Sequence, residues 1–320
     1  KSHMFHQCLE LSSVSPYFQE LLVYMGQHSC YEQGCEAIEK LLRVEVNAMQ
    51  LQRLTTTYGE RVTALLEEPT AALSVDRQQV VYAEVDGGML LTREQGWQEV
   101  KLGRVFSSQA RYQQSDGQTG IRTSEYTAHL GTHQCFEANM SVLTDKYEHL
   151  EERLIFVTDG ATWISNWLNA AYPRASQILD FYHAKEHLGQ FAITYFSNQQ
   201  QASQWIELQA AQLLEEGLEA LMADITALPA GNEAVEKQRK SLLNYYRNNA
   251  YRMNYPVYLA KGWCIGSGAI EAAHRTVSQQ RLKLSGQRWT QHGAQCVLNL
   301  RVLRMSNRWH ELQQLIKHAA

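Results

Sequence analysis

The chain has 320 residues, of which 44% are hydrophobic and 19% charged, so it is long and apolar enough for two or more folded domains. No apolar run approaches the roughly 18 residues that span a bilayer, and the net charge of −4 excludes a protein that coats nucleic acid by bulk positive charge. The six cysteines form no C-x-x-C pair, which argues against a zinc ribbon or a disulfide framework and favours a reducing cytoplasm.

The N-terminal region, residues 4–75, is predicted to be helical, and residues 1–3 have the sequence of an expression-tag remnant. Helical spacing of apolar residues predicts helices over 31–43 and from about Ala48 to Tyr58, with an N-capping asparagine between them. Two short helices joined by a tight turn are the pattern of a helix-turn-helix, whose second member enters a DNA major groove and would here expose Arg53. A plain pair of packed helices is the commoner structure with this pattern.

The chain changes to strands after residue 76. Apolar runs rich in β-branched residues predict five strands, over residues 79–85, 89–92, 97–106, 154–158 and 176–179. Helices are predicted at 136–152 and 161–171. Asp86, Asp159 and Asp180 directly follow strands. Three antiparallel strands, then helix, strand, helix and strand, predict a mixed α/β sheet flanked by helices.

Residues 184–260 contain no predicted strand and have the pattern of an all-α insertion, with helices at 200–216, 218–227 and 233–247. Two further helices are predicted at 269–284 and 291–318. The last 60 residues hold nine Lys and Arg against two acids, whereas residues 1–183 carry a net charge of −9. A basic segment in an acidic protein points to an anionic partner, although the charge of solvated helix faces also varies by chance.

Three carboxylates stand out by position. Asp86 and Asp159 each follow a strand and precede a glycine, and Glu271 lies in the first turn of a basic helix. Each has a structural explanation, since Asp-Gly is a common turn and an acid is favourable at a helix N-terminus. Carboxylate oxygens are also the ligands that magnesium prefers, and two such ions about 4 Å apart can drive phosphodiester chemistry. Together the three acids predict a site for two Mg²⁺ or Mn²⁺ ions.

Asp180 and His183 lie three residues apart at the start of a predicted helix. This spacing places both on one face, where His183 would orient a catalytic carboxylate or contact a phosphate. The structural alternative is an N-capping aspartate beside a histidine. His187 lies one turn further on, but a metal pair of His183 and His187 lacks a nearby third soft ligand.

The chain resembles the DDE transposases of bacterial insertion sequences, most closely the ISKra-like and ISLre-like groups, in four segments: VDGGMLLTREQGWQEVKLGRVF (85–106), FVTDGATWI (156–164), QILDFYHAKEHL (177–188) and IGSGAIEAAHRTVSQQRLKLSGQRW (265–289). The resemblance covers most of residues 77–320. It implies a ribonuclease H-like catalytic domain, residues 76–183 plus 261–320, interrupted by the insertion domain, residues 184–260.

The resemblance also implies residue roles and an activity. By this resemblance, the catalytic, metal-binding acids of the family correspond to Asp86, Asp159 and Glu271, and its D-x-x-H signature corresponds to Asp180 and His183. It implies metal-dependent cleavage of DNA at transposon ends, followed by strand transfer in which a 3′-hydroxyl attacks target DNA. The protein would act as a homodimer in the cytoplasm, on the nucleoid. Members usually have a longer N-terminal region with metal-binding cysteines, which this chain lacks.

Basic side chains near the predicted site are expected to contact DNA phosphates, in addition to Arg53: Lys101, Arg104, Arg275, Arg281, Lys283 and Arg288. Arg275 is also placed for an ion pair with Glu271 one turn away. Trp289 either stacks on a splayed base or packs in the core, and the core is the commoner place for it. Phosphate contacts of this kind make DNA binding fall steeply with salt.

Two other classes of function fit parts of the pattern. A non-cutting DNA-binding or regulatory protein derived from a transposase would bind DNA without a metal-dependent product, although the presence of all three acids disfavours it. A glycosidase would use two carboxylates without a metal, and the seven tryptophans and sixteen tyrosines fit a sugar site, but the basic C-terminal segment does not. A calorimetric titration with Mn²⁺ separates the glycosidase from the transposase.

Overall fold

The computed structural model describes residues 14–72, 75–76, 78–113, 115 and 119–319, and the predicted tag remnant lies outside them. The chain divides into two compact units. The first takes Lys1–Gln79, Asp86–His149 and Ala269–Ala320, and the second takes Val80–Val85 and Leu150–Gly268. The division into N-terminal, catalytic and insertion domains stays a prediction, because the two units group the chain differently. None of the described helices has the length and apolar character that crossing a bilayer requires.

A five-stranded mixed sheet has the strand order β5-β2-β1-β6-β7. Its strands are β1 (Val81–Thr92), β2 (Gly96–Ser107), β5 (Glu125–Leu130), β6 (Leu154–Thr158) and β7 (Ser176–Leu179). A tight turn joins β1 to β2, and β5 runs antiparallel to β2. In contrast, β6 is parallel to both β1 and β7. This confirms the predicted α/β fold, a ribonuclease H-like mixed sheet flanked by helices.

Several predicted elements differ from those observed, among them the helix predicted at 136–152, which is α-helical over His133–Thr144 only. The first two predicted strands form the single strand β1, in which Gly87 faces the side chain of Glu99 on the neighbouring strand. The third antiparallel strand is β5, which the sequence analysis missed. The predicted helix 291–318 is two helices, α13 (Gln291–Met305) and α14 (Trp309–Ala319), separated where Asn307 takes a left-handed φ of 58°.

The N-terminal helices of the first unit share a core with its two C-terminal helices. They are α1 (Pro16–His28), α2 (Tyr31–Leu42) and α3 (Ala48–Glu67). Asn47 caps α3, as its sequence predicts, and forms a capping box with Gln50. The helices α3 and α13 lie so close that a Cβ at Gly59 would be 2.4 Å from the carbonyl oxygen of Cys296. The N-terminal helical region is therefore confirmed, and it packs directly on α13.

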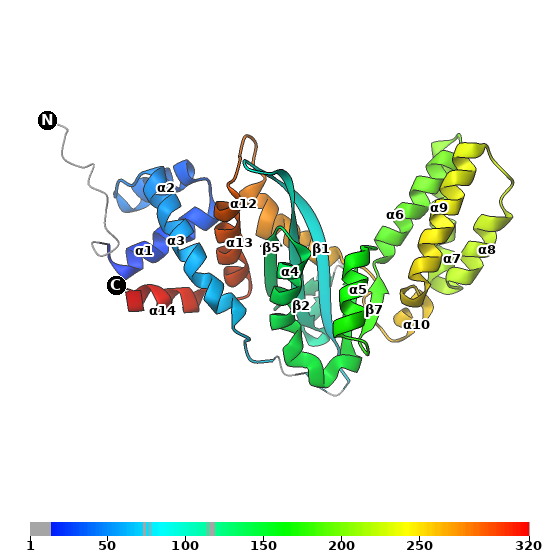
Figure 1. The fold of residues 1–320 in the computed structure, drawn as a ribbon, viewed down its shortest axis with the longest axis horizontal. Coiled ribbons are helices and arrows are strands. Elements are labelled where there is room, and N and C mark those ends of the chain that lie inside the picture. The colour runs from blue at the N-terminus through cyan, green and yellow to red at the C-terminus, as the bar shows by residue number, and fades with distance from the viewer. Residues whose placement is uncertain (1–13, 73–74, 77, 114, 116–118, 320) are drawn as a thin grey trace. The chain divides into compact units, whose positions relative to one another are not determined.

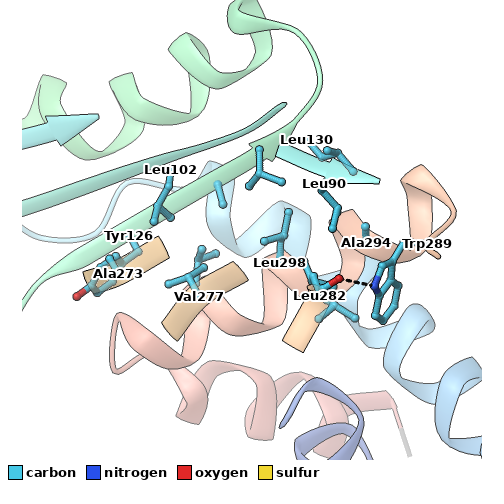
Figure 2. Close-up of a cluster of buried hydrophobic side chains, with 14 of the residues drawn as sticks. Leu90, Leu102, Tyr126, Leu130, Ala273, Val277, Leu282, Trp289, Ala294 and Leu298 are labelled. Atoms are coloured by element: carbon cyan, nitrogen blue, oxygen red, sulfur yellow. Dashed lines mark hydrogen bonds between the residues drawn. The ribbon is translucent and has the colours of Figure 1, made fainter. Parts of the chain in front are cut away.

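Opposite faces of strand β2 pack on different helices. On one face Leu102 joins the core cluster that Figure 2 shows, which includes Leu298 of α13 and Leu130 of β5. On the other face Gly103 faces Phe136 and Met140 of α4 (His133–Thr144). Successive residues of a strand point to opposite faces, so the β2–β5 part of the sheet lies between α4 and α13.

The second unit contains the other parallel strands and the helical insertion. Its helices are α5 (Thr162–Ala171), α6 (Phe181–Tyr195), α7 (Gln199–Glu215), α8 (Leu218–Ala227), α9 (Glu233–Asn249) and α10 (Tyr255–Ala260). In the insertion, α6 packs against α7 and α9, and α8 packs against the same two helices (Figure 1). The all-α insertion is confirmed, with helix boundaries within two residues of those predicted for α7, α8 and α9.

Candidate active site

The paired part of strands β1 and β6 ends just before two of the predicted acids. Val85 and Thr158 are the last partners in the parallel register, and Asp86 and Asp159 are the residues that follow them. Because β1 continues to Thr92, the prediction that Asp86 ends its strand is wrong. Both acids nevertheless come where neighbouring parallel strands stop pairing, which is where side chains leave a sheet to meet ligands.

In the first unit, Asp86 contacts a buried histidine of α11 (Gly268–His274). The Nε2 atom of His274 lies 3.6 Å from Asp86 Oδ2 and 3.1 Å from the main-chain carbonyl oxygen of Asp86. Asp86 Oδ1 accepts a hydrogen bond of 2.8 Å from the amide of Gly87. A Cβ at Gly88 would lie 3.1 Å from His274 Nδ1, so this glycine leaves room for the imidazole. His274 therefore fixes α11 against β1 at Asp86.

Glu271 lies three residues before His274 on the same helix, and its side chain is exposed. Residues three apart on a helix have Cβ atoms about 5–6 Å apart. Arg104 Nη1 donates to the carbonyl oxygen of Ala269 at 2.7 Å and holds the start of α11 in place. The first unit therefore brings Glu271 to within about one helical turn of the histidine that touches Asp86.

The helix that carries Glu271 is not a continuous α-helix as predicted. A π-helical turn at Arg275–Gln279 follows α11, and the short α12 (Gln280–Leu282) follows that. The buried guanidinium of Arg301 donates to the carbonyl oxygens of Thr276 and Val277, and to that of Gln27 at 2.7 Å. Single π-turns inside helices are rare and often lie at functional sites.

In the second unit, the turn at Asp159 packs against a tyrosine of the insertion. Asp159 Oδ1 accepts a hydrogen bond of 2.9 Å from the amide of Ala161. The hydroxyl of Tyr245 lies so near Gly160 that a Cβ there would be 2.6 Å from it. Burial raises the pKa of Tyr245 well above its usual range, and the carboxylates of Asp159 and Asp180 raise it further, against an opposite effect of Arg252.

The sequence analysis missed two residues beside Asp159. Tyr245 has a buried hydroxyl with no hydrogen-bond partner among the described residues. Arg252 is only 2% exposed, and its Nη1 lies 3.5 Å from the hydroxyl of Thr158. Both come from the insertion, far from the strand-end acids along the chain. No local pattern marks them, because their positions depend on how the insertion folds back on β6.

Replacing Tyr245 with phenylalanine should raise the free energy of unfolding, because it removes a buried hydroxyl without a partner, which costs about 1–2 kcal/mol. The neighbouring Tyr246 is the matched control, since its hydroxyl donates to the carbonyl oxygen of Ala184 at 3.0 Å. Tyr246→Phe should lower the free energy of unfolding by about 1 kcal/mol, because it removes this hydrogen bond. Urea unfolding measures both. Equal destabilisation by the two substitutions would show that the Tyr245 hydroxyl has a partner.

Asp180 is the N-cap of α6, which is the structural alternative that its sequence allows. Its Oδ1 accepts from the amides of Tyr182 at 2.6 Å and His183 at 3.0 Å. Its Oδ2 accepts from the amide and the hydroxyl of Ser267. The ring of His183 lies near a different acid, and its Nδ1 atom is 3.8 Å from Glu186 Oε2. The catalytic roles of Asp180 and His183 stay predictions, and the contacts observed are structural.

Asp180→Ala should lower the free energy of unfolding by about 2 kcal/mol, because it removes an N-cap and leaves the Ser267 amide without its acceptor. Asp180→Asn should lower the free energy of unfolding by less, because asparagine also caps helices. It still loses some stability, since its amide nitrogen cannot accept the hydrogen bonds from Ser267. Asp224 is an exposed aspartate of α8, and Asp224→Ala serves as the control. Thermal and urea unfolding measure the three variants. If Asp180→Ala were as stable as this control, the cap would contribute nothing.

A half-buried histidine in the second unit should make stability depend on pH. His187 stacks on Tyr245 with ring centroids 3.9 Å apart. Burial, and then His183, hold the pKa of His187 below the usual 6.5, while Glu186 acts in the opposite direction. The unfolded chain therefore binds a proton that the folded chain does not, and the free energy of unfolding should fall as the pH drops below 6.5.

His187→Gln should reduce this fall, whereas His310→Gln, at an exposed position of α14, should leave it unchanged. Urea unfolding at a series of pH values from about 7.5 to about 5.5 measures the slope. A slope that is the same in both variants would exclude His187 as its source.

Three of the basic residues predicted to contact DNA do not reach the surface, so the structure contradicts this role for Lys101, Arg104 and Arg281. Lys101 donates to the carbonyl oxygen of Gly131 at 2.7 Å, and Arg104 to the hydroxyl of Ser124 at 2.9 Å. Arg281 is only 1% exposed, and Lys101 and Arg104 are 5% and 7% exposed. Each cation satisfies groups inside the protein, which a sequence pattern cannot distinguish from a phosphate contact.

Four other predicted DNA contacts have exposed side chains: Arg53, Arg275, Lys283 and Arg288. Arg53 lies on α3, the second helix of the predicted helix-turn-helix. Trp289 is 8% exposed and belongs to the core cluster of Figure 2, where its indole nitrogen donates to the carbonyl oxygen of Leu282 at 3.1 Å. The core interpretation of this tryptophan is confirmed.

The three acids of the predicted metal site are divided between the units. Asp86 and Glu271 belong to the first unit and Asp159 to the second. Over the part of the chain that the structure describes, no group of three or more His, Cys, Asp or Glu side chains is arranged to hold a metal ion. The chemistry of the donors still fits a hard divalent cation, because all three acids supply carboxylate oxygens.

The model of an uncharacterised protein family, UPF0236, matches residues 18–314, which spans nearly the whole chain and reaches both units. No curated protein matches the chain.

Proposed function

The chain belongs to the uncharacterised protein family UPF0236, and we propose that its activity is that of the DDE transposases, which four of its segments resemble. The reaction is divalent-metal-dependent cleavage of DNA at the ends of a transposable element. In the second step, the 3′-hydroxyl so formed attacks a phosphodiester of target DNA. Water and the 3′-hydroxyl are the successive nucleophiles, so the protein forms no covalent intermediate.

One observation carries the proposal. Asp86 and Asp159 directly follow the last partners of two adjacent parallel strands, in a sheet of the order β5-β2-β1-β6-β7. Chemistry on a phosphodiester needs a few acids held on rigid elements despite their mutual repulsion. Asp86 meets this need through its main-chain contact with His274, and Asp159 through the turn it forms with Ala161.

In this proposal Asp86, Asp159 and Glu271 together hold two Mg²⁺ or Mn²⁺ ions. When bound, the ions supply the positive charge that activates the attacking oxygen and stabilises the leaving oxygen. The chain's own part is to place the acids: β1 and His274 position Asp86, β6 positions Asp159, and α11 positions Glu271. Arg275 is exposed and lies one turn beyond Glu271 along the chain, and it is the proposed contact for the phosphate being cut.

DNA is the proposed partner, with the exposed side chains of Arg53, Lys283 and Arg288 as phosphate contacts in addition to Arg275. A homodimer is proposed because two transposon ends have to be joined. The proposed setting is the bacterial cytoplasm, where the nucleoid supplies both ends and targets.

The test is a cleavage assay on a supercoiled plasmid that carries the DNA flanking the gene. The proposal expects nicked or linear product with Mg²⁺ or Mn²⁺ and none with EDTA. Product that forms equally well in EDTA, or DNA binding with no product in any metal, would contradict it.

The second candidate is a non-cutting DNA-binding protein descended from a transposase. One observation favours it, namely that the side chains of Arg53, Arg275, Lys283 and Arg288 are exposed, since phosphate contacts by such residues need no metal. It predicts salt-dependent DNA binding that is the same with and without Mn²⁺, and no cleavage product.

A further inference from the structure

In the first unit, the end of the β1–β2 hairpin is fixed against the loop 283–290, which joins α12 to α13 (Figure 1). Trp289 of this loop forms a parallel bridge with Thr92, and the main-chain amide of Arg93 donates to the carbonyl oxygen of Trp289 at 2.8 Å. Across the turn of the hairpin, the hydroxyl of Thr92 donates to the carbonyl oxygen of Gly96 at 2.9 Å. The hairpin end is therefore held in place by main-chain contacts with a loop that Trp289 anchors in the core.

The two faces of this hairpin end differ in burial. On one face, Leu90 and Val100 are buried in the core cluster of Figure 2. Successive residues of a strand point to opposite faces, so Met89, Leu91 and Trp97 lie on the other face. There the side chain of Trp97 is 62% exposed and that of Met89 is 46% exposed. The hairpin end therefore presents an apolar face with a large exposed indole ring.

Two exposed arginines adjoin this apolar face. They line a hollow of about 610 Å³, whose wall consists of Leu91, Thr92, Arg93, Gly286 and Arg288. Arg93 Nε donates to the carbonyl oxygen of Arg288 at 3.1 Å, which keeps the two residues next to each other. Among the described residues, none that lines the hollow is acidic. Two guanidinium groups without an acid between them suit an anionic ligand, and a phosphate matches their donor geometry.

The acids of the hairpin end have contacts of their own. Glu94 Oε2 accepts a hydrogen bond from the main-chain amide of Gln291 at 3.1 Å. Glu99 Oε2 lies 2.6 Å from Lys101 Nζ, so an adjacent cation compensates its charge. The exposed side chain of Lys283 adds a further positive charge to the loop. The charges around the hairpin end therefore favour an anionic ligand, and its exposed indole favours a ligand with a flat aromatic part.

We propose that the hairpin end binds single-stranded DNA, with an unpaired base stacked on Trp97 and the adjoining phosphates at Arg93 and Arg288. The identity of the ligand rests on the proposed function, which makes DNA the substrate. Exposed aromatic side chains on a sheet, with basic side chains beside them, are how many proteins bind single strands. A base inside a duplex is stacked on both sides and has no free face for the indole, so the bound segment is unpaired.

The position of the hairpin end along β1 says which part of the DNA it holds. Thr92, where the strand ends, comes six residues after Asp86. A strand advances about 3.3 Å per residue, so about 20 Å separates the two positions. A stacked DNA strand advances about 3.4 Å per nucleotide, so this distance corresponds to about six nucleotides. The hairpin end therefore holds DNA that flanks the cut, and not the phosphodiester that is cut.

The test measures binding of the full chain to a fluorescently labelled oligonucleotide by anisotropy, without divalent metal. The oligonucleotide is used both as a single strand and as a duplex, and the wild type should bind the single strand more tightly. Trp97→Ala should lower the affinity for the single strand about tenfold, because it removes a stacked base. Trp97→Phe should lose less, since phenylalanine also stacks. Arg93→Ala/Arg288→Ala should reduce the slope of log affinity against log salt by about 1.4, as expected for two lost phosphate contacts.

The matched controls remove exposed side chains of the first unit from other elements. Tyr17→Ala, at a residue of α1 that is 71% exposed, should leave the affinity unchanged, and Arg61→Ala/Arg122→Ala should leave the salt slope unchanged. Equal affinity of the wild type for single strand and duplex would overturn the proposal, as would a Trp97→Ala protein that binds the single strand like Tyr17→Ala. Because no cutting is needed, binding to single strands that depends on Trp97, in a protein that never cleaves, would reject only the transposase assignment.

Discussion

Asp159→Asn should reduce metal-dependent DNA cleavage about a thousandfold, because removing a carboxylate from a two-metal site forfeits several kcal/mol of transition-state stabilisation. The fold should be retained, since the Oδ1 that accepts from Ala161 is still present in asparagine. Asp86→Asn keeps its acceptor for the amide of Gly87 in the same way. Glu271→Gln changes an exposed side chain. All three variants should therefore lose cleavage and stay folded.

Cleavage of the flanking-DNA plasmid measures the rate, and far-ultraviolet circular dichroism with thermal unfolding measures the fold. Asp224→Asn removes an exposed carboxylate of the insertion and should cut like the wild type. Cleavage at the wild-type rate by any of the three acid variants would exclude that acid as a metal ligand. Retained cleavage in all three would reject the transposase assignment.

Arg301→Met should lower the free energy of unfolding by about 3 kcal/mol, the largest effect on stability that we expect from one residue. The guanidinium donates to the carbonyl oxygens of Gln27, Thr276 and Val277. Methionine has a similar length but no donor, so these carbonyl oxygens lose that contact in a buried place. Burial, with repulsion from Arg304 and Arg281, lowers the pKa of Arg301 to about 10, so the side chain still carries its charge at pH 7.

Arg304→Met is the matched control. Arg304 is one turn further along α13 and half-buried, and its guanidinium lies 4.6 Å from the ring centroid of Tyr24. Arg304→Met should therefore lower the free energy of unfolding by about 1 kcal/mol or less. Urea unfolding compares the two. Because Arg301 holds the π-turn that follows Glu271, Arg301→Met should also slow DNA cleavage. An Arg301→Met protein as stable as Arg304→Met would show that the π-turn needs no such support.

The parts of the fold that the sequence predicts are those that local chemistry determines. The insertion helices have helical spacing of apolar residues and Asn caps at 198 and 232, so their ends follow from the sequence. Strands β6 and β7 are short, apolar and followed by an acid. In contrast, the Asp-Gly-Gly segment of β1 has the pattern of a turn but lies inside a strand, because pairing with neighbouring strands, and not local sequence, decides its structure.

The candidate site, too, can be predicted from the sequence only in part. Asp159 and Glu271 are visible in the sequence because they stand at the end and the start of recognisable elements, and Asp86 is visible because a glycine pair follows it, although it lies inside β1. The buried positions of Lys101, Arg104 and Arg281 cannot be recognised in the sequence. A cation that donates to an internal carbonyl group has the same sequence pattern as one that binds phosphate. Tyr245 lies in the insertion, and only the folded chain places it at Gly160.

The central claim, that Asp86, Asp159 and Glu271 share bound metal ions, can be tested by replacing Mg²⁺ with Fe²⁺ in the protein–DNA complex. Ascorbate and peroxide then generate hydroxyl radicals at the iron, which cut the polypeptide near its ligands, and mass spectrometry identifies the cuts. We predict cuts around all three acids, suppressed by excess Mg²⁺ and lost together when any one acid is replaced. Cuts at one or two of the acids that persist after the third is replaced would contradict a shared site.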